Sequence, residues 1–258
     1  MKHSFVRRVR INPVLQVRSG VQRALKIKEL NKMVTSEELN MTFQKVGNDF
    51  GFENVDAEFS PFRDLKVKWC RTINNASFTV SDYLQEAPVE VIEGIARTIF
   101  SKIRAEENSD YPNCTKRWLT SDEFRELNQD KYVERSRTIV DVKNSEDKKL
   151  WDAYYRLIDA GLIEEIKGLK LFWSTDESVS KAGQSSCLMK VVIMNRRFMK
   201  NDVPSEVLDY CLLHEIANIT IDFGVDVLDR KRAVANIMAE CPGEEIAKKW
   251  LDQIMMEI

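Results

Sequence analysis

The stretch from Val203 to Ile221, VPSEVLDYCLLHEIANITI, places the strongest constraint on how this chain folds. Its apolar residues recur at helical spacing, which predicts a helix that is largely buried. Pro204 stands where the first turn of a helix tolerates proline, because the first amide groups of a helix lack partners within it. The same helix contains His214 and Glu215, and burying such a pair costs free energy unless the pair is hydrogen-bonded or binds a metal.

The sequence from His214 to Asn218 differs by one residue from the zinc-protease signature His-Glu-x-x-His. In that signature, two imidazoles four residues apart share a helix face and bind one zinc ion, while the glutamate acts on the attacking water. Asn218, a neutral amide, stands in place of the second imidazole and is a poor zinc ligand. The motif by itself fits either a weakened metal site with Glu215 as general base or a structural pair inside the core.

Two strands followed by a helix that begins at a proline are predicted twice. The predicted segments are 65–72, 76–84 and 88–106 in the first half, and 169–175, 187–195 and the helix from Pro204 in the second. Residues 176–186 are predicted to form a loop, and Val191–Asn195 an edge strand to which a peptide can add. The recurrence indicates either an internal duplication or local patterns that happen to agree. Thr98 is then the counterpart of His214.

The predicted fold class is α+β, with a hairpin-plus-helix unit, which is repeated if the chain is duplicated, and additional helices. Further helices are predicted to begin near Ser36 and Ser121, and one is predicted over 149–161. The expected organisation has three parts, which are a basic N-terminal segment at 1–34, a strand-strand-helix unit with a helical region at 35–148, and a second such unit at 149–258.

Composition narrows the class of protein. The chain has 258 residues, of which 43% are hydrophobic and 31% are charged, as in globular proteins with a large core. No apolar run approaches the roughly 18 residues of a membrane span, and the N-terminus lacks the apolar segment of a secretory signal. The cysteines are scattered and odd in number (Cys70, Cys114, Cys187, Cys211 and Cys241), which is typical of reduced thiols. We therefore expect a cytoplasmic protein that does not enter membranes.

Basic residues are concentrated in residues 1–34, which hold nine lysines and arginines and one acidic residue. Clustered cations can neutralise phosphates, so this segment is a candidate contact for nucleic acid, or for a protein partner. It can equally fold back on the acidic remainder of the chain or stay solvated. The arginines that we single out as candidate contacts are Arg7, Arg8, Arg10, Arg18 and Arg23.

The second half of the chain resembles a known family. Trp173, the strand at 187–195 and the helix with His214 and Glu215 are similar to the metal-dependent protease-like proteins of the SprT and YgjP type, and more closely to an uncharacterised archaeal group of the same zincin-like class. The resemblance covers about 170–258. At its end, the segment from Pro242 onward is similar to the family's closing helix. It implies a zincin-like fold.

The resemblance also implies roles for individual residues. His214 matches the first metal ligand and Glu215 the general base, whereas Asn218 replaces the second ligand. The family's third ligand lies downstream, where this chain has no histidine and only carboxylates remain as donors, namely Asp226, Asp229 and Glu240. A catalytic zinc normally keeps three protein ligands. We therefore expect no cofactor, with zinc as the alternative.

The expected function is that of a non-catalytic, metallopeptidase-like protein (a pseudoenzyme) that binds a macromolecular partner through the former cleft, the basic segment or both. The first alternative is a metal-dependent hydrolase or peptidase with an unusual ligand set. The second alternative is a nucleic-acid-binding protein that uses residues 1–34. A protein partner is expected under the leading hypothesis.

Overall fold

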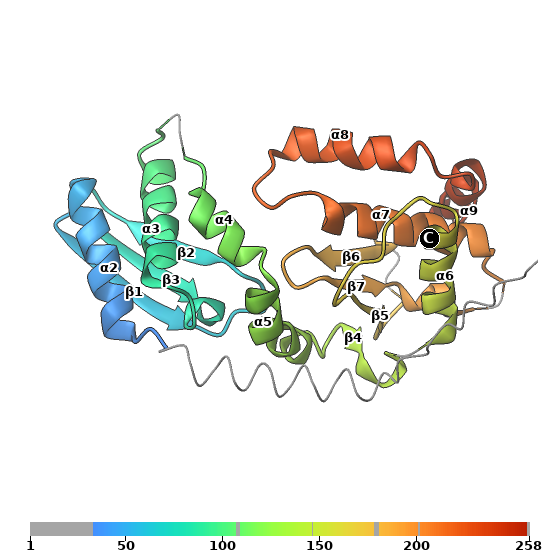
Figure 1. Cartoon of the computed structure of the whole chain (residues 1–258), viewed down its shortest axis with the longest axis horizontal. Coiled ribbons are helices and arrows are strands. Elements are labelled where there is room, and N and C mark those ends of the chain that lie inside the picture. Colours follow the sequence, from blue (N-terminus) through green and yellow to red (C-terminus); the bar gives the residue numbers. More distant parts are fainter. Residues whose placement is uncertain (1–32, 107–108, 146, 178–180, 201, 257–258) are drawn as a thin grey trace, which may run out of the picture.

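The computed structural model describes residues 33–106, 109–145, 147–177, 181–200 and 202–256. It places them in an α+β fold, as predicted, and the strands form two small mixed sheets (Figure 1). The predicted contacts Arg7, Arg8, Arg10, Arg18 and Arg23 lie outside the described residues. Of the helices in the described part of the chain, none is long and apolar enough to cross a membrane.

The first sheet belongs to a unit in which two helices pack on the same face of three strands, since Phe43 of one helix and Phe100 of the other both contact Phe78 of the sheet. Its elements in chain order are α2 (Ser36–Asp49), β1 (Asn54–Ser60), β2 (Val67–Arg71), β3 (Asn75–Ser81), the short 3-10 helix η1 (Asp82–Leu84) and α3 (Val89–Ile103). The strands lie in the order β1-β3-β2, with β1 parallel and β2 antiparallel to β3. A capping box sets the start of α2, because Thr35 and Glu38 each accept a hydrogen bond from the other's backbone N–H.

The second sheet belongs to a unit with the same order of elements. These are α6 (Lys148–Asp159), β5 (Lys170–Ser174), β6 (Gly183–Ser186), β7 (Val191–Met194), η3 (Arg196–Met199) and α7 (Ser205–Thr220). β5 runs parallel and β6 antiparallel to the central strand β7, as β1 and β2 do to β3. The short strand β4 (Val140–Asp141) extends the sheet beyond β5. The two units therefore share one topology, as an internal duplication predicts.

The second helices of the two units, α3 and α7, bury equivalent positions. Each helix follows a proline at its N-cap, Pro88 or Pro204. Counted from these prolines, the buried residues that coincide are Val91 and Val207, Ile92 and Leu208, Ile95 and Cys211, Ala96 and Leu212, Ile99 and Glu215, Phe100 and Ile216, and Ser101 and Ala217. Glu215 thus occupies a position that is a buried isoleucine in the first unit.

The structure corrects the predicted strands. No strand was predicted at 54–60, where the structure has β1, and the predicted loop 176–186 contains β6. The strand at 169–175 does not form a hairpin with the strand at 187–195, because β5 and β7 are parallel; the hairpin of the second unit joins β6 and β7. β7 is central and fully buried, so the edge strand predicted at Val191–Asn195 was wrong.

Two helices, α4 (Asn113–Leu119) and α5 (Asp122–Arg135), follow α3 and connect the two units. Two more helices, α8 (Val227–Met238) and α9 (Glu244–Met256), follow α7. From α5, Asn128 donates a hydrogen bond to the carbonyl of Tyr83 in the first unit. The adjacent Gln129 donates to the carbonyls of Gly168 and Met189 in the second unit. The buried amides of α5 therefore join the two units through backbone groups.

The hydrophobic core has two clusters that meet at the second sheet. Phe172, Val191 and Ile193 belong to the cluster of the first unit. Their neighbours along the same strands, which include Trp173 and Val192, belong to the cluster around α6 and α7. Because successive side chains of a strand point to opposite faces, the second sheet is covered on both faces and links the two cores.

Candidate functional site

His214 and Glu215 lie on α7 but face different surroundings. The side chain of His214 is 50% exposed and that of Glu215 is 11% exposed. His214 and Asn218 line an open groove of about 610 Å³ between α7 and α8, together with Tyr210, Arg230 and other residues. Neighbouring residues of a helix point about 100° apart, so Glu215 turns toward the sheet when His214 faces this groove.

Glu215 is bonded to the edge strand of the second sheet. Ser185 of β6 donates a hydrogen bond of 2.7 Å from its hydroxyl to one carboxylate oxygen of Glu215. The other oxygen lies 3.6 Å from Nδ1 of His214. β6 approaches so closely that a Cβ atom at Gly183 would lie 2.9 Å from Cγ of Glu215. The buried carboxylate therefore has polar partners, as such a group requires.

We expect replacement of Glu215 to affect stability through this contact. Glu215→Ala removes the acceptor of the Ser185 hydroxyl and should lower the free energy of unfolding by about 1–3 kcal/mol, whereas Glu215→Gln keeps an acceptor and should cost less than about 1 kcal/mol. Urea unfolding of both variants beside the wild type checks this. Equal losses of stability in the two variants would show that the charge of Glu215, and not its hydrogen bond with Ser185, stabilises the fold.

The carboxylate of Glu215 raises the pKa of His214 above its ordinary value, and partial burial of the imidazole opposes this effect. A histidine with a raised pKa in the folded state contributes stability below its ordinary pKa. That contribution disappears as the pH rises through the folded-state pKa. Because His214 is half exposed, solvent screening keeps the contribution small.

His214→Gln should therefore lower stability by less than about 1 kcal/mol near pH 5 and have no measurable effect near pH 8.5. Urea unfolding at the two pH values measures the difference. In a Glu215→Gln background, the same substitution should show no pH dependence. A loss that increases toward high pH would contradict the assigned ion pair.

The residues around His214 do not form a metal-binding cluster. No group of three or more metal-ligating side chains gathers anywhere in the described ranges. Asn218 donates to the backbone carbonyl of His214, and Asp226 accepts the N-cap hydrogen bond of α8. Burial raises the pKa of Cys211 to about 12, so this thiol stays protonated. Asp229 pairs with Arg232.

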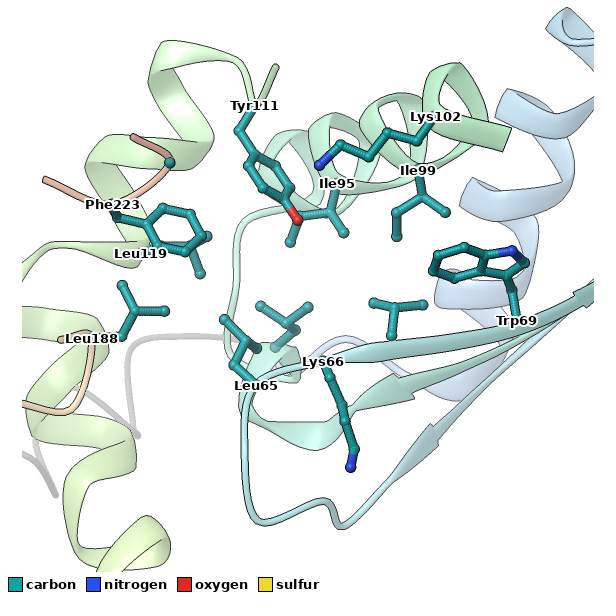
Figure 2. Close-up of a pocket in the computed structure, with 13 residues that line it drawn as sticks. Leu65, Lys66, Trp69, Ile95, Ile99, Lys102, Tyr111, Leu119, Leu188 and Phe223 are labelled. Atoms are coloured by element: carbon teal, nitrogen blue, oxygen red, sulfur yellow. The ribbon is translucent and has the colours of Figure 1, made fainter. Parts of the chain in front are cut away.

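A second candidate site is an apolar groove of about 330 Å³ between the two units. Its floor contains Ile95 and Ile99 of α3. Figure 2 shows Leu65 and Trp69 on the strand side, and Tyr111 and Phe223 toward the second unit. The full lining is Leu65, Lys66, Val67, Trp69, Leu84, Ile95, Ile99, Lys102, Tyr111, Leu119, Leu188, Phe223 and Gly224.

Trp69 is the most exposed aromatic residue of this groove. Its residue surface is 49% exposed, whereas Ile95 and Ile99 below it are 4% and 5% exposed. An exposed tryptophan beside a hollow of buried aliphatic side chains is typical of a binding surface. Lys102 lies over the ring of Tyr111 at the rim, with Nζ 5.1 Å from the ring centroid.

The corresponding faces of the two units differ. In the second unit, α7 packs directly on β6 through Glu215. In the first unit, Ile99 takes the place of Glu215 and borders the groove together with Val67 and Trp69 of β2. The space that is filled in one unit is therefore open in the other.

Comparison of the chain with protein family models, curated proteins and solved structures found no match. The resemblance to SprT- and YgjP-type proteins therefore stays a prediction.

The sequence predicted His214, Glu215 and Asn218 as neighbours on one helix, and the structure places them there. It did not predict the groove at Trp69. The alternation of Leu65, Val67 and Trp69 indicates a strand with one apolar face, but nothing local tells whether that face is covered.

Proposed function

We propose that this protein is a non-catalytic binding protein that holds a protein partner in the groove between β2 and α3. The observation that carries this proposal is the half-exposed Trp69 over the buried Ile95 and Ile99. An aromatic side chain that becomes buried when a partner binds supplies much of the affinity in protein recognition. Such a groove receives a side chain of the partner without any chemical step.

The environment of Glu215 supports the non-catalytic part of the proposal. A general base needs access to the proton that it removes, and this carboxylate is buried against Gly183 and bonded to Ser185. Among the residues that the structure describes, His214 has one carboxylate beside it and no second imidazole. A zincin-like origin is compatible with this arrangement and is part of the proposal.

The test is selection from a random peptide display library on the immobilised full-length protein. We expect recovered peptides to bind the wild type and to lose about tenfold or more in affinity for Trp69→Ala, because Trp69 is the anchor. Tyr155→Ala is the matched control, since Tyr155 is 53% exposed on α6, away from the groove. Peptides that bind both variants equally, or no recovered peptides, would contradict the proposed site.

A second measurement tests the non-catalytic part. Elemental analysis of freshly purified protein should find no stoichiometric zinc, and peptide substrates should stay intact. About one zinc per chain that is lost in His214→Ala, together with peptide cleavage, would replace the proposal with a metal-dependent hydrolase.

A further inference from the structure

The free edge of the first sheet runs along the proposed groove. β1 and β2 are the two outer strands of this sheet. The edge at β1 is covered, because the amides of Val55 and Ala57 donate to the side chains of Gln44 and Asn40 in α2. Within the described residues, no strand or capping side chain pairs with the outer edge of β2.

The hydrogen bonds at the two ends of β2 show which of its residues face outward. Ser81 donates to the carbonyl of Lys66, and Thr72 donates to the carbonyl of Asn75. In an antiparallel pair, bonded and non-bonded positions alternate. Positions 66, 68, 70 and 72 therefore bond to β3. The backbone groups of Val67, Trp69 and Arg71 point away from the sheet and are open to another strand.

The same alternation places side chains beside this edge. Leu65, Val67 and Trp69 share the face that lines the groove. Lys66 points to the other side in Figure 2. Its amino group lies 4.8 Å from the centroid of the Phe62 ring. A strand that pairs with β2 would direct every second side chain onto the groove face. Main-chain bonds and side-chain burial therefore favour the same extended ligand.

Two cations on the opposite face of β2 lack carboxylate partners among the described residues. They are Lys66 and Lys68, whose amino groups lie 4.8 Å and 5.1 Å from the ring centroid of Phe62. Both are exposed. In an added strand, the side chains between the apolar positions point to this face. Cations beside an open strand edge complement carboxylates of a partner.

We propose that β2 binds an extended, acidic peptide segment by strand addition, with apolar side chains at alternate positions in the groove. This inference rests on the proposed function and names the class of its partner. The peptide's backbone pairs with Val67, Trp69 and Arg71, its apolar side chains cover Trp69, and its carboxylates lie on the opposite face near Lys66 and Lys68.

The test uses the full-length protein and the synthetic peptide Glu-Val-Glu-Leu-Glu-Phe-Glu with blocked ends. Two further versions carry N-methyl groups on either the odd or the even residues, and a third has lysine in place of every glutamate. Because only one edge of the added strand faces β2, we expect one N-methylated peptide to bind about tenfold more weakly and the other to bind like the parent. The lysine peptide should also bind about tenfold more weakly.

Amide hydrogen exchange supplies a second observation. Binding of the parent peptide should slow exchange at Trp69 and Arg71, which face the open edge, and leave Cys70, which bonds to β3, unchanged. Trp69→Ala should weaken the parent peptide about tenfold, and Tyr155→Ala should have no effect.

The outcomes separate this inference from the proposed function. Equal affinity of both N-methylated peptides overturns strand addition, and equal affinity of the lysine peptide overturns the acidic partner. Display-selected peptides that need Trp69 but leave exchange at Trp69 and Arg71 unchanged would overturn the inference while the proposed function stands. A single-stranded oligonucleotide that binds more tightly than every peptide, and only with Trp69 present, would overturn both.

Discussion

Trp173→Ala is expected to lower the free energy of unfolding by about 3–5 kcal/mol. Trp173 lies on β5, is 0% exposed and is among the largest fully buried side chains. It packs in the cluster around α6 and α7, next to the strand β7 at the centre of the sheet. Its removal would leave a large cavity between two helices and the sheet, which neighbouring side chains cannot fill.

The control for this prediction is Trp173→Phe. The Nε1 atom of Trp173 is buried and has no hydrogen-bond partner within the described ranges, so phenylalanine removes no polar contact seen there and should cost less than half as much as alanine. Urea unfolding followed by far-UV circular dichroism measures both. A loss below about 1 kcal/mol for Trp173→Ala would contradict the assigned burial.

Phe100→Ala should cause a similar loss of about 3–5 kcal/mol. Phe100 lies on α3, is fully buried, and has its ring centroid 5.0 Å from that of Phe78, 5.2 Å from Phe52 and 5.6 Å from Phe50. Aromatic pairs at such distances add to the free energy of burial. The substitution therefore removes both volume and three ring contacts.

Phe100→Leu is the matched control, since it keeps most of the apolar volume and should cost less than about half as much as alanine. The same urea unfolding experiment applies. Equal stability of Phe100→Ala and the wild type would show that the aromatic cluster does not hold α3 on the first sheet.

Together the two alanine variants test how the units unfold. Phe172, Val191 and Ile193 of the second sheet belong to the core of the first unit, and Gln129 of α5 bonds to Gly168 and Met189. We expect each substitution to shift one common transition, because loss of either core exposes the shared sheet. Two separate transitions, each moved by one variant only, would show that the units unfold independently.

Helical segments were predictable because their signal is local. The helix from Ser36 has a capping box and apolar residues at helical spacing, and the helix after Pro204 has its proline and a buried face. Both predictions were confirmed. Strands were predicted less well. β6, with the sequence Gly-Gln-Ser-Ser, has no apolar residue, and no strand was predicted at β1 although its apolar residues alternate.

The sequence by itself determined the local elements, the prolines that begin α3 and α7, and the adjacency of His214, Glu215 and Asn218. Only the tertiary structure decided that Glu215 binds Ser185 of β6, that β7 is central and that β2 keeps an open edge beside Trp69. The physical reason is that periodicity reports which face of an element is apolar. Which strand pairs with which, and which face stays uncovered, depends on contacts between residues far apart in the chain.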